Sequence, residues 1–187
     1  GMDLPGVHSC WTLADARAIA QRAGKGARVL QMGAGFIGCI IMEALAARGV
    51  QLTVVEMGDR MVPRMMGPTA GGMIKDWCEK KGVRVFTGTR VEAIEAASAA
   101  APVSGGLLSR VAAAVGLGHH DAPAAPSAAP LRVRLSNGQS LEADLVISAT
   151  GVKPNIGLLE NSGVKCALGV LTDEHLQTNV PGIYAAG

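Results

Sequence analysis

The sequence predicts an α/β fold in which a central parallel sheet carries an inserted antiparallel β-meander. The first observation is an apolar strand that runs into a Gly-x-Gly-x-x-Gly turn and a helical segment at 28–48, followed by a second strand at 51–55. Strand, helix and strand in this order indicate parallel pairing. The second observation is an alternating run at 131–142 that contains an Asn-Gly pair, which is typical of an antiparallel hairpin. A buried strand at 144–151 follows it.

The glycine turn after the first strand predicts a dinucleotide-binding site. Gly33 permits the tight turn, Gly35 lets a diphosphate approach the backbone, and Gly38 lets the helix pack closely on the strand. The helix N-terminus then offers unpaired N–H groups and a positive dipole end to the phosphates. A purely structural turn is the alternative, and the order of strand, turn, helix and second strand favours the binding site.

An acidic residue follows the second strand. Glu56 lies about 20 residues past the glycines, where a carboxylate accepts hydrogen bonds from the adenosine ribose hydroxyls. This favours NAD, because a carboxylate there repels the 2′-phosphate of NADP. The alternative is that Glu56 is a surface residue placed there by coincidence. Arg60 and Arg64 could reach a phosphate, but we favour the interpretation that they are surface charges on a loop.

The remaining elements are expected at defined positions. Residues 4–11 are expected to form a loop, and Thr12 to Asp15 resembles a capping box that opens a helix ending at Ala23. We expect a helix over 68–81 and a third parallel strand over 83–87. The first meander strand is expected around 91–94.

A low-complexity insertion is expected over 97–130, between the first and second meander strands. It is dominated by alanine and proline, so we interpret it as a mobile excursion, with a short docking helix as the alternative. His119, His120 and Asp121 lie within it. Adjacent histidines without a closed ligand set do not make a metal site, so no metal is predicted.

Composition excludes several classes of function. A net charge of +2 and 3% aromatic residues argue against nucleic-acid binding. No membrane span or signal peptide is visible, so we expect a cytoplasmic protein. The cysteines have no paired spacing and are interpreted as small buried side chains in a reducing compartment. They are Cys10, Cys39, Cys78 and Cys166.

Four features together resemble the FAD-dependent pyridine nucleotide-disulfide oxidoreductases. They are the glycine turn, the inserted meander, the phrase Ala-Thr-Gly-Val-Lys-Pro-Asn at 149–155, and the terminal Thr-Asn-Val-Pro-Gly-Ile-Tyr-Ala-Ala-Gly at 178–187. The chain is similar to the NAD(P)H-binding domain, with a Rossmann-like FAD/NAD(P)-binding fold. It looks most like the branch of NADH oxidases, ferredoxin or rubredoxin reductases and nitrite reductase large subunits.

The resemblance implies a set of cofactor-binding residues and no catalytic side chain. Five residues of the turn would wrap the diphosphate, Glu56 would hold the ribose, Val91 would lie near the adenine, and two residues would border the nicotinamide. The complete set is Gly33, Gly35, Phe36, Ile37, Gly38, Glu56, Val91, Thr150 and Gly151. Many relatives carry a glutamate two residues after the third glycine, whereas this chain has Ile40.

The resemblance also implies separate tasks for this chain and for a flavin-binding domain. Residues 1–27 would be a connecting segment with a short helix, and 28–187 an NADH-binding domain that positions NADH for hydride transfer to a flavin. FAD would belong to a domain absent from this chain, so the fragment alone would bind NADH, not bind FAD and turn nothing over. The electron acceptor stays open. A free-standing binding or sensor module is the alternative, and a dehydrogenase is disfavoured because no Tyr-x-x-x-Lys pair occurs.

Overall fold

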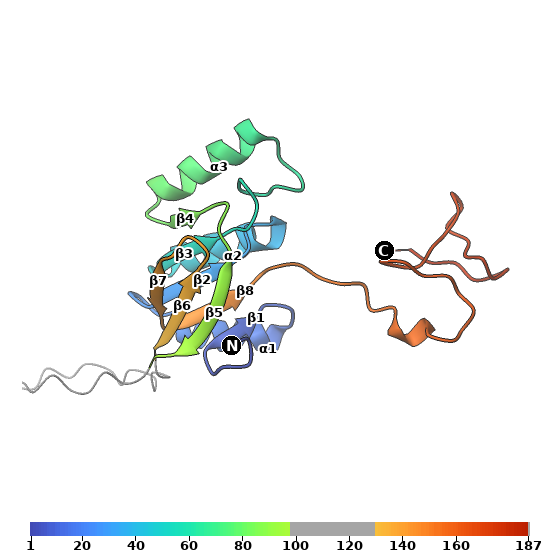
Figure 1. Cartoon of the computed structure of the whole chain (residues 1–187), viewed down its shortest axis with the longest axis horizontal. Coiled ribbons are helices and arrows are strands. Elements are labelled where there is room, and N and C mark those ends of the chain that lie inside the picture. The colour runs from blue at the N-terminus through green and yellow to red at the C-terminus, as the bar shows by residue number, and fades with distance from the viewer. Residues whose placement is uncertain (98–129, 187) are drawn as a thin grey trace, which may run out of the picture. The chain divides into compact units, whose positions relative to one another are not determined.

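The computed structural model describes residues 1–97 and 130–186 (Figure 1). It divides the chain into two compact units, Gly1–Thr150 and Gly151–Gly187. Within the described residues, the first unit holds a five-stranded parallel sheet, a three-stranded antiparallel sheet and three α-helices. Whether residues 1–27 act as a connection to another domain stays a prediction.

The parallel sheet confirms the predicted α/β fold. In spatial order its strands are β1 (Val7–Ser9), β8 (Leu145–Ser148), β2 (Arg28–Met32), β3 (Gln51–Val55) and β4 (Arg84–Phe86). The strands β2 and β3 are in register from the pair Arg28 and Gln51 to the pair Met32 and Val55. Because they end side by side, the turn after β2 and the residue after β3 lie next to each other.

Strand β1 corrects the prediction that residues 4–11 form a loop. Val7, His8 and Ser9 pair in parallel with Val146, Ile147 and Ser148. The helix that follows, α1 (Leu13–Arg22), matches its prediction, because Thr12 and Asp15 form the capping box. The N-terminal residues therefore extend the sheet at the free edge of β8.

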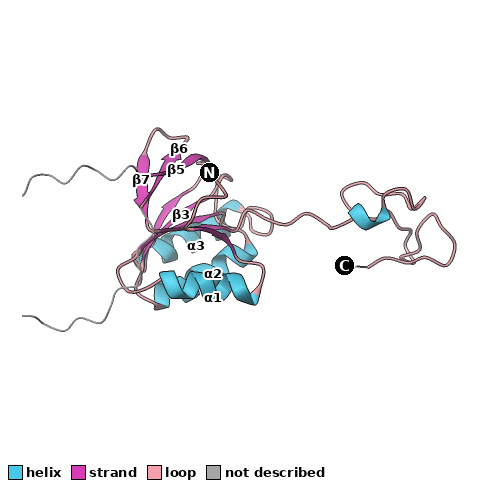
Figure 2. Ribbon diagram, turned by 90° about the horizontal axis from the view of Figure 1, so that it is seen from below, coloured by secondary structure: helices cyan, strands magenta, loops and turns pink. Residues whose placement is uncertain are grey.

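The helices lie on one face of the parallel sheet (Figure 2). They are α1, α2 (Phe36–Ala47) and α3 (Pro68–Lys80). Alternate side chains of β2 and β3, such as Val29 and Val54, pack with Met42, Leu45 and Cys78 of the helices. Removing such apolar surface from water is the main stabilisation available to this layer.

The antiparallel sheet covers the other face (Figure 2). It consists of β5 (Val91–Ala96), β6 (Leu131–Leu135) and β7 (Ser140–Ala143). Side chains of β6 alternate between buried and exposed, and Val133 packs against Leu30, Val55 and Val146 of the parallel sheet. The meander is confirmed, including the hairpin turn, where Gly138 has a φ of 82°.

The two ends of the insertion meet at the open end of the β5–β6 pair. Ala96 pairs with Leu131, and the Ala97 N–H donates to the Pro130 carbonyl at 2.8 Å. The alternatives for the insertion, and the prediction that His119, His120 and Asp121 hold no metal, concern 98–129, which lie outside the described residues.

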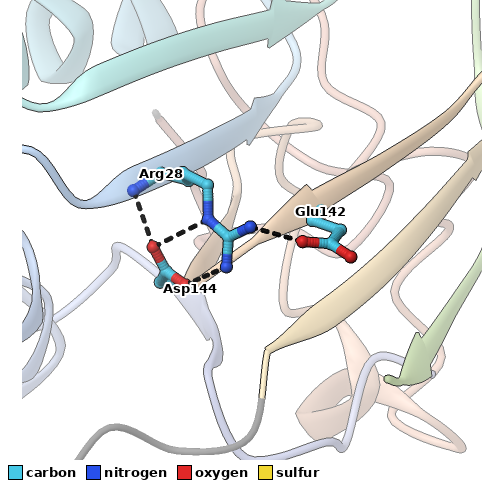
Figure 3. Close-up of polar contacts among 3 residues, drawn as sticks. All are labelled: Arg28, Glu142 and Asp144. Carbon is cyan, nitrogen blue, oxygen red and sulfur yellow. Dashed lines mark hydrogen bonds and ion pairs between the residues drawn. The ribbon is translucent and has the colours of Figure 1, made fainter. Parts of the chain in front are cut away.

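Arg28 joins the start of the parallel sheet to the meander (Figure 3). Its Nη2 and Nε donate to Asp144 at 2.6 and 3.1 Å, and its backbone N–H donates to the same carboxylate at 2.9 Å. Its Nη1 donates to Glu142, at the end of β7, at 2.5 Å. These hydrogen bonds hold the pKa of Asp144 below its usual value and raise the pKa of Arg28.

The Arg28 network predicts a loss of stability in acid. A lowered folded pKa means that Asp144 stabilises the fold above its unfolded pKa of about 4, and that this stabilisation is lost as the pH falls through the folded pKa. The variant Asp144→Asn should therefore lose less stability than the wild type between pH 7 and pH 3 in thermal unfolding. The control is Asp3→Asn, an exposed residue, which should follow the wild type.

Solvent limits how much the interaction between Arg28 and Asp144 stabilises the fold. The side chains of Arg28 and Asp144 are 36% and 40% exposed, so screening reduces their interaction. A double-mutant cycle with Arg28→Met and Asp144→Asn should give a coupling of about 1 kcal/mol at pH 7. A coupling energy at pH 3 equal to that at pH 7 would contradict the assignment of this coupling to the ionised Asp144 carboxylate.

The second unit has little regular structure within its described residues. It contains the 3-10 helix η1 (Gly157–Leu159) and two isolated bridges, Cys166 with Val170 and Gln177 with Tyr184. Across both units, the helices in residues 1–97 and 130–186 are too short or too polar to span a bilayer.

The four cysteines are free thiols with different environments. Cys78 is buried, and Cys10 and Cys39 are partly buried, so desolvation raises the pKa of each of these thiols. Cys166 is exposed, which makes the prediction of a buried side chain wrong at this position. Its segment carries no packed layer that would cover it.

Candidate dinucleotide-binding site

The three glycines of the turn after β2 differ in what surrounds them. Gly33 has a φ of 95°, and a Cβ there would lie 2.5 Å from the Ala149 carbonyl oxygen. A Cβ on Gly38 would lie 2.6 Å from the Gly33 carbonyl oxygen, so only glycine lets α2 approach β2 this closely. A Cβ on Gly35 would meet nothing within 4 Å. Two glycines are thus required by the fold, whereas Gly35 is not.

The backbone of Ala34, between the first two glycines, is held from both sides. Its N–H donates to Glu56 Oε2 at 2.7 Å, and its carbonyl accepts from the Val62 N–H at 2.8 Å. Val62 has a φ of 50°, which is unusual for a β-branched residue and indicates local strain. The Gly33 N–H donates to the Val55 carbonyl at 2.8 Å. The inner side of the turn is therefore fixed by its neighbours.

The outer side of the turn presents free donors. Among the described residues, the N–H groups of Gly35, Phe36 and Ile37 have no protein acceptor, and Gly35 provides no side-chain cap for α2. The side chains of Phe36 and Ile37 are 61% and 44% exposed. Free N–H groups at the positive end of a helix dipole can bind an anion without a basic residue. A diphosphate fits this chemistry, and the open position at the Gly35 Cβ lets it approach the backbone.

Glu56 lies directly after β3 and beside this turn. Its side chain is largely buried, and besides Ala34 it holds the Gly58 N–H, which donates to Oε1 at 2.6 Å. Two backbone hydrogen bonds fix the carboxylate while leaving further lone pairs on each oxygen. Glu56 therefore has a structural task that the sequence did not reveal, and its contact with the ribose hydroxyls stays a prediction.

Arg60 is not the free surface charge that the sequence favours. Its guanidinium donates to the Met66 carbonyl at 2.8 Å and to Asp59 at 2.7 Å, so it folds the loop between β3 and α3 on itself. A Cβ on Gly71 of α3 would lie 2.9 Å from the Arg60 Cβ, so this loop packs tightly on the helix. Arg64 is exposed, as the interpretation of surface charge expects.

The other candidate residues lie at strand ends. Val91 begins β5, two residues after Thr89, whose N–H donates to the Glu56 carbonyl at 3.0 Å. This hydrogen bond brings the start of β5 beside the end of β3. Thr150 follows β8, and its hydroxyl lies 3.3 Å from that of Ser148. Gly151 is the first residue of the second unit, so its role at the nicotinamide stays a prediction.

The contacts of Gln31 on β2 do not follow from the predicted strand. The side chain is fully buried, and its Nε2 donates to the carbonyls of Gly33 and Gly38 at 2.9 and 3.0 Å. The signal in the sequence is a polar residue in an otherwise apolar strand, two positions before the first glycine. Ile40, in the first turns of α2, is 57% exposed, so the turn of helix next to the glycines presents an apolar side chain.

Comparison with known proteins identifies the family. The sequence matches the pyridine nucleotide-disulphide oxidoreductase family over residues 1–187. The chain belongs to this family. This family member is 30% identical to the NADH-dependent phenylglyoxylate dehydrogenase subunit epsilon of Aromatoleum evansii, over 100% of this chain and 37% of that protein. It is 30% identical to the NADH oxidase of Methanocaldococcus jannaschii, over 100% of this chain and 36% of that protein.

A solved structure supports the fold assignment of this oxidoreductase family member. The water-forming NADH oxidase of Lactobacillus brevis, bound to NADH, superimposes with a TM-score of 0.76 at 25% identity. The match covers 100% of this chain and 35% of that one. The chain thus spans little more than a third of the length of these three relatives.

Proposed function

We propose that this chain is an NADH-binding domain of a FAD-dependent pyridine nucleotide-disulphide oxidoreductase. The observation that carries the proposal is the contrast within the glycine turn. Gly33 and Gly38 are packed against backbone, whereas Gly35 has open space and stands beside the free N–H groups of Phe36 and Ile37. The fold needs glycine at the first and third positions of the motif, and a bound diphosphate gives a reason for glycine at the second, Gly35.

The proposed nucleotide is NADH rather than NADPH. The Glu56 carboxylate is held in place by the N–H groups of Ala34 and Gly58, so it cannot swing away to admit a second negative group. A 2′-phosphate on the adenosine ribose would meet this fixed charge. Arg60, which could offset that charge, is engaged by Asp59 and the Met66 carbonyl.

The chain's own task in the proposed reaction is binding and orientation. NADH supplies a hydride from nicotinamide C4, and a flavin supplies the acceptor, N5. The residues Thr150 and Gly151, after the end of β8, would border the nicotinamide, and no side chain of the site is needed as an acid or base. Holding the two reacting atoms near contact removes much of the entropic barrier, roughly 7–11 kcal/mol at best. FAD itself would be held by residues outside this chain.

Calorimetric titration of the chain with NADH, NADPH and FAD tests the proposal. We expect NADH to bind at one site, NADPH to bind at least about tenfold more weakly, which corresponds to about 1.4 kcal/mol, and FAD not to bind. The chain alone should not oxidise NADH in the presence of an artificial acceptor. Equal affinities for NADH and NADPH would contradict the role of Glu56, and no binding of either would contradict the site.

A second experiment separates the two functions that the sequence allows. The complete natural protein should contain FAD, and its flavin absorbance should be bleached by NADH under anaerobic conditions. NADH binding without any flavin reduction would instead favour the free-standing binding or sensor module.

A further inference from the structure

Gln31 is a polar side chain in the most apolar layer of the molecule. It lies on β2 and faces the same side as Val29, which packs among the helices. Its exposed fraction is 0%. An apolar residue of similar size would be the ordinary choice at such a position, because burying an amide costs free energy unless all of its polar atoms are paired.

The amide of Gln31 is only half paired. Nε2 makes two hydrogen bonds, whereas Oε1 is buried and has no partner among the described residues. An unpaired buried oxygen costs free energy, because it has lost its hydrogen bonds to water and gained none in the protein. Glutamine is therefore a poor choice for stability alone at this position. Its advantage must come from the two hydrogen bonds that Nε2 donates.

The two acceptors of Nε2 lie on either side of the diphosphate-binding segment. One is the Gly33 carbonyl, before the turn, and the other is the Gly38 carbonyl, in the first turn of α2. Between them stand Gly35, Phe36 and Ile37, which offer the free N–H groups. A Cβ on Gly38 would lie 3.0 Å from Gln31 Nε2, so the amide packs tightly against the turn. Bridging the two carbonyls fixes the distance between the ends of this segment.

We propose that Gln31 is a positioning residue that holds the glycine turn in its diphosphate-binding conformation. The inference rests on the proposed function and deepens it. Glu56 and Val62 hold the middle of the turn at Ala34, and Gln31 holds its two ends from the interior. With the ends fixed, the free N–H groups are already oriented before the ligand binds. Less conformational entropy of this segment is then lost on binding.

The variant Gln31→Met tests the proposal, because methionine has similar length and lacks the amide. Titrations use ADP-ribose, which carries the diphosphate, and adenosine, which lacks it. We expect Gln31→Met to weaken ADP-ribose binding about tenfold, or about 1.4 kcal/mol, and to change adenosine binding less than twofold. The control Gln51→Met replaces an exposed glutamine at the start of the neighbouring strand and should change neither.

A second variant keeps the test decisive if Gln31→Met folds poorly. In Gln31→Glu a carboxylate faces two carbonyl oxygens, and protonation of this buried group restores one donor. ADP-ribose binding by Gln31→Glu should therefore strengthen severalfold from pH 8 to pH 6, whereas wild-type binding should not. A merely structural residue would not produce this dependence.

The outcomes distinguish this inference from the proposed function. Unchanged ADP-ribose affinity in Gln31→Met, or an equal loss for ADP-ribose and adenosine, would overturn the positioning role while the proposed function stands. Failure of the wild-type chain to bind ADP-ribose and NADH would overturn both.

Discussion

Replacing Gly35 with valine is expected to weaken NADH binding at least about 100-fold, or about 2.7 kcal/mol, while the melting temperature stays unchanged. Gly35 has a φ of −73° and a ψ of −172°, which any residue adopts, and a Cβ there meets no protein atom within 4 Å. The valine side chain would instead occupy the space beside the free N–H groups of Phe36 and Ile37. Calorimetric titration and thermal unfolding of the same preparation measure the two effects.

The same substitution at two other glycines provides the controls. Gly33→Val should not fold, because Gly33 has a φ of 95° and a Cβ would lie 2.5 Å from the Ala149 carbonyl oxygen. Gly24→Val lies in the turn after α1, where a Cβ has open space, and it should keep both stability and NADH affinity. Full NADH affinity in Gly35→Val would place the diphosphate elsewhere.

The substitution Glu56→Ala is expected to reduce both stability and NADH binding. It removes the acceptor of the Ala34 and Gly58 N–H groups, and leaving two such donors unpaired should cost about 3 kcal/mol of unfolding free energy. It also frees the glycine turn and removes the proposed partner of the ribose hydroxyls. We expect NADH affinity to fall about tenfold, measured by calorimetry well below the lowered melting temperature.

The ratio of the NADPH affinity to the NADH affinity distinguishes the loss of a ribose contact from the loosening of the glycine turn. Loosening the turn weakens NADH and NADPH alike, whereas removal of the charge should raise the affinity for NADPH relative to NADH. Asp59→Ala is the matched control, because Asp59 is a carboxylate of the same loop that bonds Arg60 and is 73% exposed. If the ratio changes equally in both variants, the preference comes from the general charge of the loop and Glu56 does not contact the ribose.

The parts of the fold that follow from local sterics were predictable. Gly33 and Gly38 are glycines because a Cβ at either would clash with backbone, and such positions leave a fixed spacing in the sequence. The helix α3 begins at Pro68 and ends before Gly82, as its breakers predict. The meander follows from alternation in β6 and from the Asn-Gly turn.

The parts that depend on distant partners were not predictable. Strand β1 is three residues long, and its pairing partner, β8, lies at the other end of the first unit. The bonds of Arg60 to Asp59 and Met66 depend on a loop that has no sequence periodicity. Gln31 resembles any polar interruption of a strand until the fold brings the carbonyls of Gly33 and Gly38 to its amide.

The end of the β5–β6 ladder at Ala97 and Pro130 has a practical consequence for protein engineering. Ala96 pairs with Leu131, and the Ala97 N–H bonds the Pro130 carbonyl, so both strands are aligned by their own hydrogen bonds up to the point where they diverge. The free energy of closing a connection at such a point changes only slowly with its length. A fluorescent protein inserted between Ala97 and Pro130 would therefore be attached to the meander while the hydrogen bonds that align its first two strands remain in place.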